Sequence, residues 1–361
     1  MSNKKGALVD FRDWAHLPPE IVESISEKVK SITDLARFRS VCSPWRSATF
    51  PKPRHLPPQL PWLMLQCHTN CYDGNRIHFF YDVWESKMRE IHLPETIGMT
   101  CSGSYRGWLL LTSTRGKHVF FLNPLTRVRI QLPPFPSFEG TFDFGKSKVT
   151  FSTDLTDLNC LIMVLLNRYW VMCCRVGDRH WRRVSSRSNS DADVMDATYC
   201  NGRFYFLFGG NITIIEPNKP EKTILLHQPE LRTVGKCFVE GKSGVYVLAI
   251  HPKGKFQLYR FQEQTMELNH ITETSDNTAI FYGDCFPRFA VRNDDWDSLD
   301  GGSVYVEYQC MPYAWKRAVR SGYSKYSAGP AEGKDFVMCD LVKEPRFRPV
   351  EPAMWFQPSF H

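Results

Sequence analysis

Two short stretches bring together residue types that could bind a metal ion. In "CHTNC", Cys67, His68 and Cys71 could donate to zinc, but a structural zinc site needs four ligands and no second pair is spaced to supply them. In "DDWDSLDGG", Asp295 and Asp297 would be the first and third residues of a calcium loop. The fifth and twelfth positions of that loop carry leucine and valine instead of oxygen ligands. We therefore expect no metal ion and no other cofactor.

Catalytic residue sets are also missing from the sequence. There is no GxSxG, P-loop, GxGxxG or HExxH motif, and "CSGSYRG" fails the nucleophile-elbow spacing because Ser104 directly follows Gly103. We therefore expect a protein that binds other molecules and has no catalytic residues.

The stretch "DLARFRSVCSPWR" has a pattern that suits binding. Its apolar residues recur every three to four positions, which places them on one face of a helix, and arginines lie between them. Such a face packs either inside a helical unit or against a partner protein. The apolar residues are Leu35, Phe38, Val41, Cys42 and Trp45.

Residues 14–50 are predicted to form three short helices that carry this face. Pro18 and Pro19 suit a first helical turn, and the apolar residues after them recur at helical spacing. We expect Ser43 to cap a short third helix with Pro44 at its first position. A unit of this size buries little apolar area by itself, so part of its apolar face should meet a partner.

The chain changes character after these helices. Residues 51–61 contain five prolines, which indicates a stiff, extended linker. Beyond it, short runs rich in Val, Ile, Phe, Tyr and Trp predict strands, in repeats of roughly 40 to 50 residues that indicate an all-β propeller of about six or seven blades. A β-sandwich or two smaller β-domains is the alternative. "WLML" after the linker and "MWFQP" at the end are placed to share or flank one blade.

Composition limits the partners that can be expected. The net charge of +7 arises from 45 basic and 38 acidic residues and does not indicate nucleic acid. Two basic runs, "GDRHWRRV" and "WKRAVRSGYSK", are predicted to be solvated loops, with an acidic protein or nucleic acid as alternative partners. The first residues lack the apolar core of a signal peptide and no stretch is long and apolar enough for a membrane span, so we expect a cytoplasmic or nuclear protein.

The segment "LPPEIVESISEKVKSITDLARFRSVCSPWRSAT" resembles an F-box. The agreement extends over many positions in order and spacing, although Pro44 stands where that family usually carries a polar residue. The matching residues are Leu17, Pro18, Ile21, Ile25, Asp34, Leu35, Phe38, Val41, Cys42, Trp45 and Arg46.

The rest of the chain resembles the plant KIB-type β-propeller domain that follows such F-boxes. The similarity lies in "LPWLML", "GWLLL", "FFLNPLTRVRIQLP" and "AIFYGDCFPRFAV", whereas residues 311–335 fit no element of it. The two resemblances imply an F-box at 13–50, the linker at 51–61 and the propeller at 62–361, a fold that is α+β by domain.

Together they imply the substrate receptor of an SCF-type ubiquitin ligase. The F-box would dock a Skp-family adaptor, and through it a cullin, while the propeller binds an unknown target protein. Two alternatives stay open: an F-box protein that inhibits a partner such as a kinase by occlusion, and a propeller enzyme. The expected adaptor contacts are Leu17, Pro18, Ile21, Ile25, Leu35, Phe38, Val41, Cys42, Trp45 and Arg46, with Trp45 as the anchor. By fold analogy, the target contacts are Trp296, Tyr313 and Trp315 at the propeller mouth.

Overall fold

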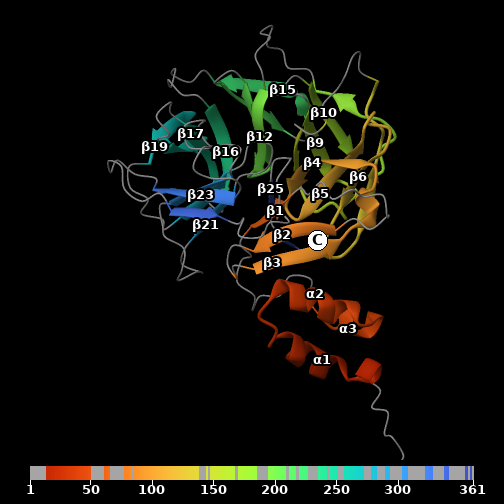
Figure 1. The fold of residues 1–361 in the computed structure, drawn as a ribbon. Coiled ribbons are helices and arrows are strands. Elements are labelled where there is room, and N and C mark those ends of the chain that lie inside the picture. The colour runs from red at the N-terminus through yellow and green to blue at the C-terminus, as the bar shows by residue number, and fades with distance from the viewer. Residues whose placement is uncertain are drawn as a thin grey trace, which may run out of the picture. The chain divides into compact units, whose positions relative to one another are not determined.

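The computed structural model describes most of the helical and strand-forming parts of the chain (Figure 1). The described residues fall into two compact units, one within 14–49 and one within 61–359. They are residues 14–49, 61–65, 77–82, 85, 87–137, 144, 147–166, 170–184, 194–208, 211–216, 219–226, 235–241, 244–250, 256–271, 278–282, 289–292, 303–307, 322–327, 337–340, 354–356 and 358–359.

The first unit is helical. A 3-10 helix, η1 (Trp14–His16), precedes α1 (Pro19–Ser26), α2 (Ile32–Ser40) and α3 (Ser43–Ser47). Pro18 is the N-cap of α1, whereas Pro19 and Pro44 lie in first turns, where the missing N–H would have had no helical partner. The third helix begins one residue earlier than predicted: Cys42 is its N-cap and Pro44 is its second residue. A proline at the first or the second helical residue loses no hydrogen bond of the helix, so the sequence alone could not decide where α3 begins.

The second unit is built from β-sheets, and those with four strands are antiparallel throughout. Four of them contain four strands each. In sheet order they are β25 (Met354–Phe356), β1 (Trp62–Leu65), β2 (Ile77–Asp82) and β3 (Lys87–His92); β4 (Met99–Tyr105), β5 (Trp108–Ser113), β6 (Val119–Leu122) and β7 (Arg129–Leu132); β8 (Lys148–Phe151), β9 (Leu161–Leu166), β10 (Trp170–Arg175) and β11 (Arg182–Arg183); and β12 (Val194–Cys200), β13 (Arg203–Phe208), β14 (Asn211–Glu216) and β15 (Lys219–Leu226).

A nine-stranded sheet completes this unit. Its two halves meet through one parallel residue pair, Glu240 with Phe289. A short 3-10 helix, η2 (Pro94–Thr96), lies between β3 and β4. In sheet order the nine strands are β19 (Glu267–His270), β18 (Phe256–Gln262), β17 (Gly244–Ile250), β16 (Gly235–Gly241), β21 (Phe289–Arg292), β20 (Thr278–Tyr282), β22 (Ser303–Glu307), β23 (Gly322–Ser327) and β24 (Val337–Asp340).

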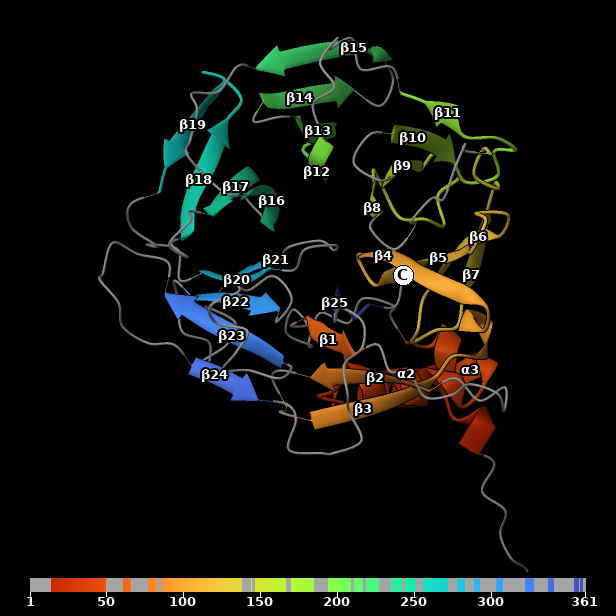
Figure 2. The ribbon, with the colours of Figure 1, turned by 45° about the horizontal axis from the view of Figure 1, so that its top comes forward.

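The sheets stand around a common centre, which is the arrangement of a β-propeller, as predicted (Figure 2). The strands nearest the centre contact one another in sheet order: β25 with β4, β4 with β8, β8 with β12, β12 with β16, and β16 with β21. The third and fourth sheets therefore each pack both faces against neighbouring sheets. Strands buried on both faces explain the uninterrupted apolar runs of this sequence.

Strand β9 shows how the two faces are shared. Ile162, Val164 and Leu166 pack into the core between the second and third sheets. The residues between them, Leu161 and Met163 among others, pack into the core between the third and fourth sheets. Because side chains alternate along a strand, one six-residue run supplies both cores.

The C-terminal residues close the ring. Strand β25 pairs with β1 in antiparallel register, so the predicted sharing of one sheet by "WLML" and "MWFQP" is confirmed. The fully buried Phe356 packs against Phe80 and Trp62, with ring centroids 5.4 and 6.2 Å apart. The last strand thus fills the place nearest the centre in the sheet that the first three strands began.

Residue Ser359 then joins the chain end to the second sheet. Its backbone carbonyl accepts a hydrogen bond from Asn123 Nδ2 at 2.9 Å, and its Oγ donates to the carbonyl of Arg106 at 3.0 Å. Gly107, beside Arg106, has a φ of +85° and leaves room for this contact, because an added Cβ would lie 1.9 Å from Ser359 Oγ. The C-terminal segment therefore joins the first sheet to the second.

Several predicted features lie outside the described residues. They include "CHTNC", the target contacts Trp296, Tyr313 and Trp315, and the linker except for Pro61. Residues 311–335, which fitted no expected element, contain strand β23. Within the described ranges, no helix reaches the length and apolar character that crossing a bilayer requires.

The closure contact can be tested with two glycines that share a backbone conformation. Gly107 and Gly177 have φ of +85° and +88°, but a Cβ at Gly177 would meet nothing within 4 Å. Alanine at either position should cost about 1–2 kcal/mol of backbone strain. Gly107→Ala should also displace Ser359 and its hydrogen bonds, and so lower the free energy of unfolding by about 1 kcal/mol more.

Thermal and urea unfolding of the two variants measure this difference. Equal destabilisation would show that the Ser359 contact contributes nothing. Removal of residues 353–361 deletes β25 and should lower the melting temperature further, and an unchanged melting temperature would argue against ring closure at this position.

Candidate functional site

Apolar side chains lie exposed on the helical unit. Ile21 and Ile25, one turn apart on α1, are 48 and 37% exposed, and Val41, which follows α2, is 60% exposed. Between them on α1, Val22 is only 1% exposed and faces the unit's interior. The 3.6-residue period separates the two sets of α1 residues, so this helix is apolar on a face that the unit itself does not cover.

The interior of the unit is small. Within residues 14–49, the buried apolar residues are Val22, Ile32 and Leu35, at 1, 6 and 1% exposure. Leu35 was predicted to contact the adaptor, but its position inside the unit leaves it no surface to offer. It supports the helices that carry the exposed residues.

Trp45 is held mainly by its own unit. Its ring packs on Phe38 with centroids 4.4 Å apart, and its indole Nε1 donates to the carbonyl of Trp14 at 2.9 Å. Both rings are partly buried. Trp45 therefore joins η1, α2 and α3, and only part of its ring can meet another molecule.

An arginine pair fixes the ends of α2 and α3. Arg39 donates through Nη1 to Thr49 Oγ1 at 2.8 Å and to the Thr49 carbonyl. Arg46 Nε donates to the carbonyl of Arg39 at 3.3 Å. Burial and, after it, the charge of Arg46 lower the pKa of Arg39. Arg46 itself stays exposed, so a partner that brings a carboxylate here would meet two neighbouring positive charges.

The ten predicted adaptor contacts thus fall into three groups by exposure. Five of them are exposed, four are partly buried and one is buried. The exposed residues are Pro18, Ile21, Ile25, Val41 and Arg46; the partly buried ones are Leu17, Phe38, Cys42 and Trp45; and Leu35 is buried.

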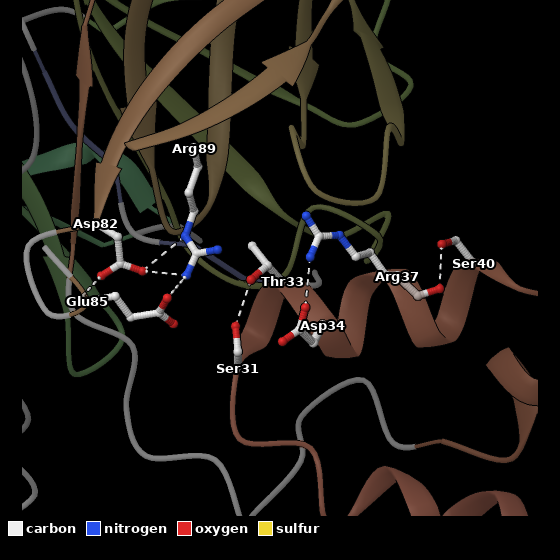
Figure 3. A network of polar contacts seen from close by, with 8 residues as sticks. All are labelled: Ser31, Thr33, Asp34, Arg37, Ser40, Asp82, Glu85 and Arg89. Atoms are coloured by element: carbon white, nitrogen blue, oxygen red, sulfur yellow. Dashed lines mark hydrogen bonds and ion pairs between the residues drawn. The ribbon is translucent and has the colours of Figure 1, made fainter. Parts of the chain in front are cut away.

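Another side of α2 is polar (Figure 3). Arg37 pairs with Asp34 at 2.8 Å, with both side chains more than half exposed, and Ser40 Oγ donates to the Arg37 carbonyl. Exposed pairs of this kind contribute less than about 1 kcal/mol. Asp34, although part of the F-box pattern, therefore lies on a solvated surface, and its ion pair adds little stability.

Figure 3 also shows an ion cluster in the second unit. Arg89 on β3 lies 3.0 Å from Asp82 on β2 and 2.7 Å from Glu85 in the hairpin between them. The Arg89 guanidinium also lies over the Trp62 ring, 5.2 Å from its centroid. With Arg89 and Asp82 nearly buried, the cluster fixes the β2–β3 hairpin and has no free group for chemistry.

The described thiols do not form a reactive site. Burial raises the pKa of Cys160, Cys173 and Cys174, so these groups stay protonated and poorly nucleophilic. The seven cysteines whose side chains are described are all free. In the same part of the chain, no group of three or more His, Cys, Asp or Glu side chains is arranged to hold a metal ion.

Comparison with known proteins finds a family match over much of the second unit. The sequence profile described as "KIB1-4 beta-propeller" matches residues 80–322. The F-box protein SKIP23 of Arabidopsis thaliana is 25% identical over 354 residues, which cover 81% of this chain and 83% of that protein. The putative F-box protein At4g22180 of the same plant is 26% identical over 220 residues, or 54% of this chain and 52% of its own length.

The match thus spans about half of the second relative's length. Among solved structures, virginiamycin B lyase from Staphylococcus aureus aligns with 61% of this chain and 71% of its own, at 13% identity and a TM-score of 0.36, which is too low to carry an argument. The profile match covers more than half of the chain and falls on the propeller described above, and so the chain belongs to the KIB1-4 β-propeller family, whose relatives found here are plant F-box proteins.

Proposed function

We propose that this protein is the substrate-recognition subunit of an SCF-type ubiquitin ligase. The helical unit acts as the F-box and docks a Skp-family adaptor, and through it a cullin. The propeller binds the protein to be ubiquitinated. The observation that carries the proposal is the exposure of Ile21, Ile25 and Val41 on a unit whose own apolar interior is small.

Exposed apolar residues on a small unit favour association because binding removes their apolar surface from water. Burial of apolar area contributes about 25 cal/mol per Å², so covering three branched side chains supplies several kcal/mol towards binding. In the proposed interface Ile21, Ile25 and Val41 form the dry centre. Pro18 and Arg46 lie at the rim, and Trp45 contributes the part of its ring that its own unit leaves uncovered.

The propeller suits the receptor role because apolar cores between its sheets hold them in a fixed arrangement. We propose six blades, with the nine-stranded sheet divided at the single pair of Glu240 and Phe289 into β16–β19 and β20–β24. A receptor of this kind performs no bond chemistry itself. It raises the effective concentration of the target near the conjugating enzyme, an effect that depends on fixed geometry.

Ile21→Asp tests the docking face. Ile21 is 48% exposed, so the substitution should leave the helical unit folded, while an unpaired carboxylate in a dry interface loses its hydration. We expect adaptor affinity to fall at least roughly 30-fold, equivalent to about 2 kcal/mol. The measurement is pull-down and titration calorimetry with purified Skp adaptor.

Lys28→Asp is the matched control, since it introduces the same residue at an exposed site just beyond α1. It should bind the adaptor like the wild type. If Ile21→Asp also bound the adaptor normally, the F-box assignment and the ligase function that rests on it would both fall. Trp45→Ala should weaken binding too, but it removes the packing on Phe38, so Trp45→Phe must accompany it to separate lost contact from lost structure.

A second experiment separates degradation from occlusion. If the protein is a ligase receptor, blocking the proteasome should lengthen the half-life of a co-purified target, and the Ile21→Asp variant should stabilise that target in the same way. An inhibitor that acts by occlusion would leave the half-life unchanged in both cases. Pulse-chase labelling of the target with each variant makes the measurement.

A further inference from the structure

Two described segments of the propeller carry an excess of positive charge. Residues 113–137 and 170–184 contain eight lysines and arginines and one acidic residue, Asp178, which leaves a formal charge of +7. The whole chain also carries +7, so all other residues together are balanced. The two segments form the outer parts of the second and third sheets, which are neighbours in Figure 2.

Direct contacts join the two segments. The indole Nε1 of Trp181, just before β11, donates to the carbonyl of Pro133 at 2.8 Å, and its ring lies 5.0 Å from Phe135. The N–H of Phe135 in turn donates to the carbonyl of Gly116 in the β5–β6 loop. Basic residues flank each of these contact points. We name as the basic rim the exposed residues Arg115, Lys117, Arg129, Arg179, Arg182 and Arg183.

Two guanidinium groups of the basic rim lie over aromatic rings. Arg129 on β7 lies 3.9 Å from the centroid of Phe120 on β6, and Arg183 on β11 lies 3.9 Å from the centroid of Trp170 on β10. Arg129 Nη2 also donates to Gln131 Oε1 at 2.8 Å. Stacking orients the planar group before a ligand arrives and leaves N–H donors at its edge, which suits bidentate binding of carboxylates.

Among the residues that the structure describes, acidic side chains do not neutralise the rim. None of its six residues forms an ion pair with an acidic side chain in the described part of the protein. Asp178, the one acid within the two segments, accepts a hydrogen bond from the backbone N–H of Arg175 at 2.8 Å. The rim therefore presents uncompensated charge to solvent.

We propose that the basic rim binds an acidic, aspartate- or glutamate-rich segment of a partner protein. Nucleic acid fits less well because single strands need exposed rings for base stacking. Phe120, Phe135 and Trp181 are buried, and Arg183 covers the partly buried Trp170. This inference rests on the proposed role of the propeller as the target-binding part, and it names the chemistry of the target.

The test uses the full chain and a fluorescein-labelled peptide of alternating glutamate and glycine, with a glutamine–glycine peptide as the uncharged probe. Fluorescence anisotropy at low ionic strength should show binding of the glutamate peptide alone. The double variant R129Q/R183Q should weaken that binding about tenfold, as expected for two lost exposed charge pairs. The charge-preserving R129K/R183K should recover only part of the loss, because lysine lacks the planar donor edge.

The matched control is K87Q/R260Q, which removes two exposed positive charges from strands β3 and β18 and should bind like the wild type. R115Q/K117Q, in the β5–β6 loop, gives an independent loss if R129Q/R183Q proves unstable by circular dichroism. Equal binding of both peptides, or an equal loss in the control, would overturn the proposal. So would a single-stranded oligonucleotide that binds more tightly than the glutamate peptide with the same dependence on the rim. No step uses the adaptor, so the outcome is independent of the test of the F-box.

Discussion

Closure of the ring is the constraint on which the propeller depends. A row of sheets leaves two outer faces without partners, whereas a ring buries every face. The chain achieves closure by placing β25 beside β1, more than 280 residues earlier, and by carrying Ser359 on to the second sheet. A contact between residues so far apart is expensive in loop entropy, and it forms only because the intervening sheets already bring the two ends together.

Polar contacts near the centre fix the sheets relative to one another. Asp196 on β12 accepts a hydrogen bond from the N–H of Phe238 on β16 at 2.7 Å and lies 3.3 Å from Lys148 Nζ on β8. One buried carboxylate on β12 thus contacts the inner strands on both sides of it, β8 and β16. Its charge is paired and hydrogen-bonded, as burial requires. Because these contacts are directional, they fix the relative positions of the sheets more closely than apolar packing alone would.

The two units differ in how completely they cover themselves. The propeller buries most of its described aromatic and aliphatic residues between sheets, with Ile97, Val128 and Leu158 as exceptions, and four of its thiols are buried with them. The helical unit leaves branched apolar residues in water. That contrast fits the two proposals made above, in which the helices associate through an apolar surface and the propeller through charged groups on its periphery. Charge offers selectivity and rapid encounter without requiring an exposed apolar area that would favour aggregation.

Much of this organisation was predictable from local patterns. Helical spacing located three short helices, prolines located their first turns, and uninterrupted apolar runs located strands, because each signal arises from neighbours in the chain. Such patterns could not say which apolar residues of the helices are covered. Leu35 and Val41 belong to the same stripe, yet one is 1% and the other 60% exposed, because packing between helices decides which residues are covered.

The basic rim shows the same limit at longer range. The run "GDRHWRRV" was visible in the sequence, but its meeting with "TRGKH" depends on Trp181 reaching Pro133 and Phe135. The sequence by itself determined the element types, the order of the two units and the absence of a complete catalytic motif, since these depend on adjacent residues. Only the tertiary structure decided which side chains are exposed and which distant charges lie together, because burial and long-range contact depend on how the whole chain packs.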